Sequence, residues 1–132
     1  MEEILLTIFI LITSSVCSAW TQKINCTAPQ SIYFDYTVEM KSETFPKIRA
    51  LITAKKNQKS KIFSGVGYYT QEFDFDTGKK MTGFNIHIDS EDLSSANTFS
   101  IMFEDKKNQG SGLINSIELT GKNEIISSSC NR

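Results

Sequence analysis

Alternation of apolar and polar residues is the main pattern along this chain. Between residues 32 and 40 an apolar side chain occupies every second position. Successive side chains of a strand point to opposite faces, so this alternation predicts a half-buried β-strand. Similar patterns complete a set of eight predicted strands: Ile32–Met40, Lys47–Ala54, Lys61–Val66, Tyr69–Phe75, Thr82–Asp89, Thr98–Glu104, Leu113–Thr120 and Glu124–Ser129. No convincing 3.6-residue apolar stripe is present, and residues 90–96 suit at most one helical turn.

Turn-forming clusters such as Asp76-Thr77-Gly78 and Gly110-Ser111-Gly112 separate these segments. Eight short strands with intervening turns predict an all-β, single-domain antiparallel β-sandwich or jelly roll, with a flattened barrel as the alternative. The chain is 39% hydrophobic and 22% charged. These values are ordinary for a globular domain and argue against a disordered or collagen-like chain.

The first residues have a different character. An apolar run over residues 4–12 precedes the small residues of 13–19. The run is shorter than the roughly 20 apolar residues that span a bilayer, and its small-residue ending is typical of a secretory signal peptide. We therefore expect a signal peptide at 1–19 and a domain at 20–132 that is secreted, extracellular and not membrane-spanning. An uncleaved membrane anchor is the alternative, because Glu2 and Glu3 replace the usual basic start.

Cysteine usage supports an extracellular protein. Cys17 leaves with the predicted signal peptide, and Cys26 and Cys130 remain. An even pair of cysteines in an oxidising compartment predicts a disulfide bond, here one that closes most of the mature chain. Asn25-Cys26-Thr27 is an N-glycosylation sequon, which makes Asn25 a candidate modification site.

Charge gives no support for nucleic-acid binding. Without residues 1–19, which hold two acids and no Lys or Arg, fourteen basic residues face thirteen acidic ones, a net charge of +1. Nucleic-acid binding usually requires a clear basic excess. Counting the eight predicted strands up and down places three lysine-bearing turns at one end of the domain. That end would present Lys55, Lys56, Lys59, Lys61, Lys79, Lys80, Lys106 and Lys107 to an anionic partner. The competing interpretation is that these lysines keep the protein soluble and protect strand edges.

The sequence contains few residues or motifs that suit a catalytic site. His87 is the only histidine, and the alternation of its segment places it on a polar face. A two-histidine metal site is therefore impossible, and the sequence has no G-x-S-x-G motif. We predict no catalytic residues, no metal and no cofactor, although hydrolysis through an unidentified carboxylate pair remains an alternative. Tyr33, Tyr68 and Tyr69 are candidates for stacking on sugar rings.

Two resemblances point in the same direction. The pattern Gly65-Val66-Gly67, then Phe73, then Gly83-Phe84-Asn85-Ile86-His87-Ile88 resembles the secreted insect family of probable salivary secreted peptides. The segment Gly112–Thr120 resembles the last strand of carbohydrate-binding jelly rolls. The first resemblance implies an extracellular, non-enzymatic protein, and the second implies a lectin-like module.

The sequence therefore predicts a secreted, non-enzymatic binding protein. Its expected partner is a sulfated glycan, a phospholipid headgroup or an acidic protein, recognised through lysine-rich turns. The alternative is a carbohydrate-binding module that uses tyrosines on a sheet face.

Overall fold

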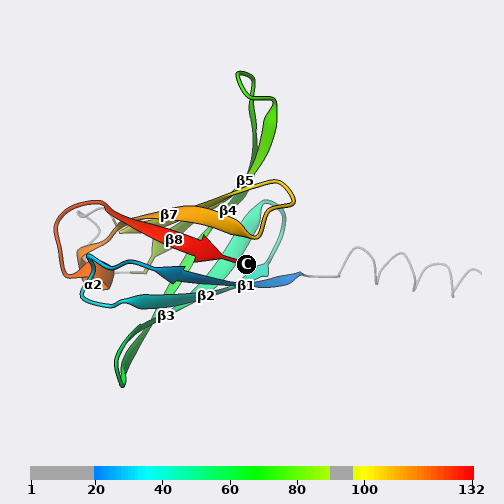
Figure 1. The fold of residues 1–132 in the computed structure, drawn as a ribbon. Coiled ribbons are helices and arrows are strands. Elements are labelled where there is room, and N and C mark those ends of the chain that lie inside the picture. The colour runs from blue at the N-terminus through cyan, green and yellow to red at the C-terminus, as the bar shows by residue number, and fades with distance from the viewer. Residues whose placement is uncertain (1–19, 90–96) are drawn as a thin grey trace, which may run out of the picture.

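Eight strands and one short helix make up the described part of the chain (Figure 1). The computed structural model describes residues 20–89 and 97–132, so the predicted signal peptide and the helical turn at 90–96 lie outside the described residues. The elements are β1 (Thr21–Thr27), β2 (Asp35–Ser42), β3 (Lys47–Lys56), β4 (Lys59–Asp74), β5 (Lys79–Ile88), β6 (Thr98–Glu104), β7 (Gln109–Asn115), α2 (Ile117–Thr120) and β8 (Ile126–Asn131).

The sheet is an antiparallel meander that closes on itself. Each strand pairs with the next one in sequence, and β1 also pairs with β8. The prediction of an all-β, antiparallel domain of eight strands is confirmed. The sheet forms a closed barrel, which was the predicted alternative, in place of a two-sheet sandwich or jelly roll. Sequence neighbours remain spatial neighbours around the whole circle, so no strand needs the long crossing connection of a Greek key.

Two strand assignments were wrong. Thr21–Thr27 forms β1, although only Ile24 and Cys26 are buried along it and its alternation is short. The segments predicted as Lys61–Val66 and Tyr69–Phe75 form one strand, β4, which continues through Gly67. The two errors cancel in the strand count. The second error, however, changes which turns share an end of the barrel, because it adds one reversal of the chain between the 57–58 and 75–78 connections.

The predicted strand Leu113–Thr120 ends early, at Asn115, and its last residues form α2. Ser116 caps this helix, because its side chain accepts a hydrogen bond from the backbone N–H of Leu119. Gly121 ends it in the left-handed conformation at φ 73° and donates its N–H to the carbonyl of Ile117. The local capping chemistry therefore overrides the apolar alternation. Leu119 and Thr120 are fully buried.

Side chains fill the barrel interior. An eight-stranded barrel encloses a space just wide enough for inward-facing residues. The largest side chains that are less than 2% exposed include Tyr36, Phe84, Phe99 and Phe103. Small residues are required where strands approach closely. A Cβ added to Gly67 would lie 1.9 Å from the carbonyl oxygen of Asn85 on β5.

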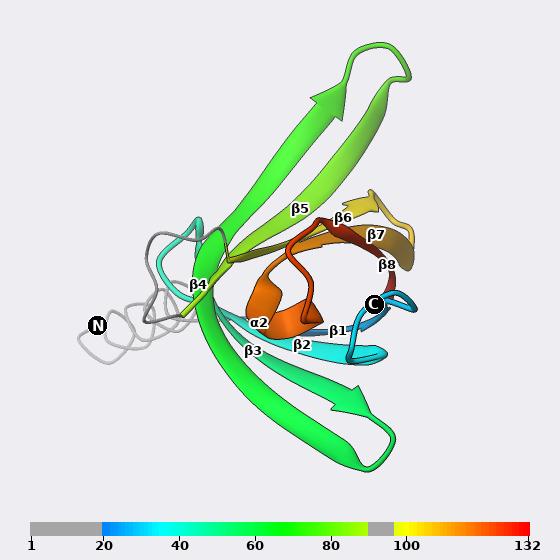
Figure 2. The same ribbon diagram turned by 90° about the vertical axis from the view of Figure 1, so that its left-hand side faces the viewer.

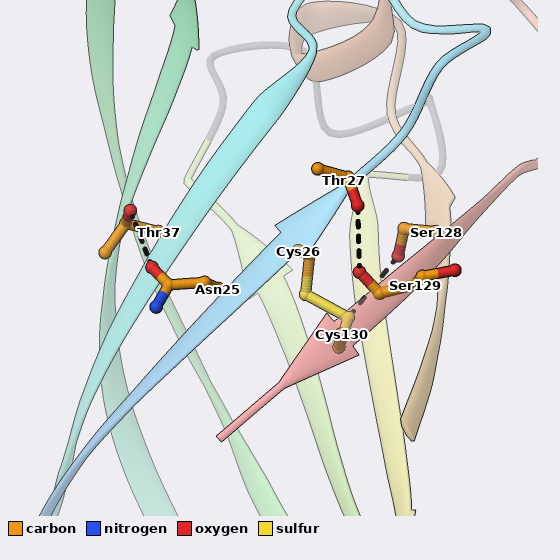
Figure 3. The surroundings of a disulfide bond; sticks show 7 residues. All are labelled: Asn25, Cys26, Thr27, Thr37, Ser128, Ser129 and Cys130. Atoms are coloured by element: carbon orange, nitrogen blue, oxygen red, sulfur yellow. Dashed lines mark hydrogen bonds between the residues drawn. A yellow bond between two sulfur atoms is a disulfide. The ribbon is translucent and has the colours of Figure 1, made fainter. Parts of the chain in front are cut away.

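The disulfide lies at the seam that closes the barrel (Figure 3). Strands β1 and β8 share only three aligned residue pairs, and the middle pair is Cys26 with Cys130. The two sulfur atoms are bonded, and their Cα atoms are 4.1 Å apart. Thr27 Oγ1 donates to the carbonyl of Ser129 beside this bridge. The predicted disulfide is confirmed, and it links the first strand to the last across the shortest ladder of the sheet.

Candidate functional site

The barrel has two ends of different construction. Connections alternate between the ends in an up-and-down barrel, so the 28–34, 57–58 and 116–125 connections share one end, here called the α2 end. The 43–46, 75–78 and 105–108 connections share the other, here called the Trp20 end. The β3–β4 and β4–β5 hairpins extend from the barrel in opposite directions (Figures 1 and 2).

The structure divides the eight predicted lysines between these ends. Lys55, Lys56, Lys59 and Lys61 lie on the β3–β4 hairpin at the α2 end. Lys79, Lys80, Lys106 and Lys107 lie at the Trp20 end. The predicted single lysine pole is therefore wrong, because β4 was counted as two strands and one reversal of the chain too many was placed between Lys61 and Lys79.

The Lys55–Lys61 hairpin carries four lysines and no acidic residue. Lys56 is aligned directly opposite Lys59, and a tight turn at Asn57, with φ 57°, joins them. All four lysines are exposed. Among the described residues, no carboxylate oxygen lies within the 4.0 Å of these ammonium groups that defines an ion pair. The hairpin therefore gathers four lysines without an ion-pair partner among the described residues within seven consecutive positions.

The lysines at the Trp20 end have acidic neighbours. The ammonium groups of Lys79 and Lys107 lie 3.6 Å and 3.8 Å from the same oxygen of Glu104. Asp74 is aligned opposite Lys79, and its carboxylate accepts the backbone N–H of Asp76 at 2.9 Å. That hydrogen bond is the main reason that the pKa of Asp74 is lowered. The positive charge at this end is thus partly neutralised within the protein.

The three candidate tyrosines do not form one surface. Tyr68 and Tyr69 are consecutive on β4 and point to opposite faces of the sheet. Tyr69 packs against Trp20 and Phe84 inside the Trp20 end, with ring centroids 6.1 and 5.6 Å away.

Tyr33 lies near the α2 end, where its ring contacts Tyr36 and Phe63. Of the three candidates, Tyr68 alone is mostly exposed, at 53%. The predicted stacking surface of three tyrosines is therefore wrong. Tyr33 and Tyr69 are packing residues.

The register of β1, β2 and β3 also brings together a basic surface that the sequence did not predict. Lys41 is aligned with Arg49, and together with Lys23 they line an outer hollow of about 640 Å³ across β1, β2 and β3. Arg49 Nε donates to Glu43 at 2.7 Å, and Glu39 lies in the same hollow. This surface was not predicted because β1 was not predicted, and Lys23 lies beside Lys41 and Arg49 only when Thr21–Thr27 pairs with β2.

Residues with catalytic potential are dispersed in the described ranges. His87 is exposed on the outer face of β5, as its alternation predicted. The described residues contain no cluster of three or more His, Cys, Asp or Glu that could hold a metal ion. Asn25 is exposed on β1, and its side-chain oxygen accepts a hydrogen bond from Thr37 Oγ1 at 3.1 Å (Figure 3).

Comparison with known proteins leaves the geometry as the only guide to function. No family model, curated protein or solved structure matches the chain. Within residues 20–89 and 97–132, no helix is long and apolar enough to cross a membrane.

Proposed function

We propose that this chain is a secreted, non-enzymatic binding protein that captures an anionic partner through the Lys55–Lys61 hairpin. The observation that carries the proposal is the absence of a carboxylate partner for any of its four lysines among the described residues. Unneutralised, exposed ammonium groups create a local positive potential that accelerates capture of anions. The buried seam disulfide supports a protein that works in an oxidising compartment.

The position of the hairpin also supports this role. Residues 59–63 of β4 extend past the end of β5, whose ladder with β4 begins at the pair Gly65–Ile88. Lys59 and Lys61 therefore stand clear of β5, and Lys56 lies beyond the last pair of the β2–β3 ladder, Asp35 with Lys55. Lysines on such a free edge also discourage strand-to-strand aggregation. Edge protection alone predicts no affinity for anions above that expected from net charge, so the two roles can be separated by experiment.

The test compares two variants with identical changes in net charge. Wild-type protein and both variants are applied to immobilised heparin and to anionic vesicles at low salt, then eluted with a salt gradient. The first variant removes the lysines at the α2 end, and the second removes those at the Trp20 end: K55Q/K56Q/K59Q/K61Q and K79Q/K80Q/K106Q/K107Q.

The proposal predicts that the wild type is retained and is released between about 0.1 and 1 M salt, where the Debye length falls from about 10 to 3 Å. The α2-end variant should elute markedly earlier than the Trp20-end variant. Flow-through of the wild type from every anionic matrix at low salt would refute the proposal. Equal loss in both variants would show a net-charge effect instead of a site.

A further inference from the structure

The lysines of the Lys55–Lys61 hairpin are not equivalent, because strand alternation sorts them between its two faces. Lys56 shares its face with Ala54, and Lys61 shares its face with Phe63. Ala54 and Phe63 are buried and face the barrel interior. Lys56 and Lys59 form an aligned pair, as do Ala54 and Lys61. Three lysines therefore lie on the inner face of the hairpin: Lys56, Lys59 and Lys61.

The fourth lysine lies on the outer face. Lys55 is aligned with Ser60, and Ile62 is the next residue of β4 on that side. Lys55 also neighbours Asp35, its aligned partner on β2. The outer face of the hairpin thus has one lysine and a nearby acid, and the inner face has three lysines and no acid.

The inner-face lysines are close enough to act on one ligand. Directly opposed residues of an antiparallel pair have Cβ atoms about 4.5–5.5 Å apart, which applies to Lys56 and Lys59. Residues two apart on one strand, such as Lys59 and Lys61, are separated by roughly 6.8 Å. Like charges directly opposite one another destabilise a sheet. A bound polyanion would relieve this repulsion.

The surroundings of these lysines favour a hydroxylated polyanion. Lys56, Asn57, Gln58 and Lys59 line a hollow of about 460 Å³ at the hairpin turn. The amide groups of Asn57 and Gln58 can donate to and accept from sugar hydroxyls. No aromatic side chain occurs between Lys55 and Lys61 to anchor the hairpin in a bilayer interface. Lys61 Nζ lies 5.1 Å from the centroid of the Phe63 ring, which favours a position on the inner face.

We infer that the inner face of the Lys55–Lys61 hairpin binds a segment of a sulfated polysaccharide, with Lys56, Lys59 and Lys61 contacting its sulfate groups. This inference rests on the proposed function and specifies both its ligand class and its contact residues. A lysine ammonium binds an oxyanion as a point charge. Sulfates spaced roughly 5–7 Å apart match the spacing at which the strand backbones attach the three lysine side chains.

The test uses four single variants that each remove one charge from the same hairpin: K56Q, K59Q, K61Q and K55Q. Affinity for a heparin oligosaccharide of defined length is measured by calorimetry at several salt concentrations. Each of the first three substitutions should weaken binding by about 1.4- to 5-fold, the range expected for one exposed ion pair. K55Q should weaken binding less than any of these three, because Lys55 adds to the positive potential of the hairpin from its outer face but contacts no sulfate group. The triple variant K56Q/K59Q/K61Q should lose about tenfold or more and show a shallower salt dependence.

Further probes separate failure of this inference from failure of the proposed function. An equal effect of K55Q and K59Q would overturn the assignment to the inner face while anion capture stands. Anionic phospholipid vesicles, polyglutamate and inositol hexakisphosphate are each compared with heparin. Tighter binding of any one of them than of heparin would overturn the sulfated-polysaccharide assignment alone. Absence of binding to all four probes would overturn both.

Discussion

Opening the disulfide tests whether the seam limits the stability of the barrel. Cys26 and Cys130 are separated by 104 residues, so their bond closes almost the whole domain into one loop. The chain-entropy model gives about 4.7 kcal/mol for a loop of about 100 residues. A domain of this size has a total stability of the order of 5–15 kcal/mol. We therefore expect reduction to remove a third or more of the free energy of unfolding and to lower Tm by roughly 15–20 °C.

The measurement is urea-induced unfolding of oxidised and reduced wild-type protein, followed by circular dichroism. The reduced protein keeps both sulfur atoms, so it reports loop closure without a large change in packing. The variant C26A/C130A additionally removes two buried side-chain atoms, and each should cost about 1 kcal/mol. The reductant must have no effect on this variant, which makes it the control for the reagent.

A small effect would contradict the reasoning about the seam. If reduction changes the free energy of unfolding by less than about 1 kcal/mol with an unchanged m-value, the three-pair ladder between β1 and β8 closes the barrel without the bridge. Both sulfurs belong to residues that are at most 3% exposed. Reduction without denaturant should therefore be slow, because the seam has to open before a reagent reaches the bond.

Two further predictions concern packing and pH. Gly67→Ala should lower the free energy of unfolding by about 3 kcal/mol or more, because the added Cβ would overlap the Asn85 carbonyl oxygen. The control is Val66→Ala at the exposed neighbouring position, which should change the free energy of unfolding by less than about 0.5 kcal/mol. Equal effects of these two substitutions in urea unfolding would contradict the close approach of β4 and β5. Tyr36→Phe should cost about 1–3 kcal/mol at pH 7, because the Tyr36 hydroxyl donates to the buried Leu119 carbonyl at 2.8 Å. Burial raises the pKa of Tyr36, so the wild type loses this tyrosine's contribution as pH rises from about 10 through the raised value. The stability difference from Tyr36→Phe should therefore narrow in alkaline unfolding experiments, and a constant difference would show that Tyr36 does not titrate differently in the folded protein.

Much of the fold follows from local patterns that the sequence displays. Alternation indicates that one side of a segment is buried, so residues 35–40 and 98–104 were recognisable as strands without any knowledge of their neighbours. The predicted strand began too early, at Ile32, because Ile32 and Phe34 continue the alternation although both are exposed in the loop before β2. The same alternation placed His87 on an exposed face. The pairing of Cys26 with Cys130 also needed no structure, because only two cysteines remain after the predicted signal peptide.

The candidate site depended on information that alternation does not carry. A short strand such as β1 buries too few side chains to stand out, so the sequence did not place Lys23 beside Lys41 and Arg49. Continuity of β4 through Gly67 removes one reversal of the chain and therefore places Lys59 and Lys80 at opposite ends of the barrel. The sequence did not predict this continuity, because a glycine in a strand and a glycine in a turn have the same sequence signature.

The sequence by itself determined the all-β character of the chain and the buried faces of most strands, because burial of apolar side chains imposes a period of two residues. The tertiary structure decided the closure of the sheet, since the pairing of β1 with β8 joins residues more than 100 positions apart. It also decided the grouping of charges, because the number of times the chain reverses direction sets the end at which each lysine lies. Lys56, Lys59 and Lys61 therefore form one face only after the register of β3 and β4 is known.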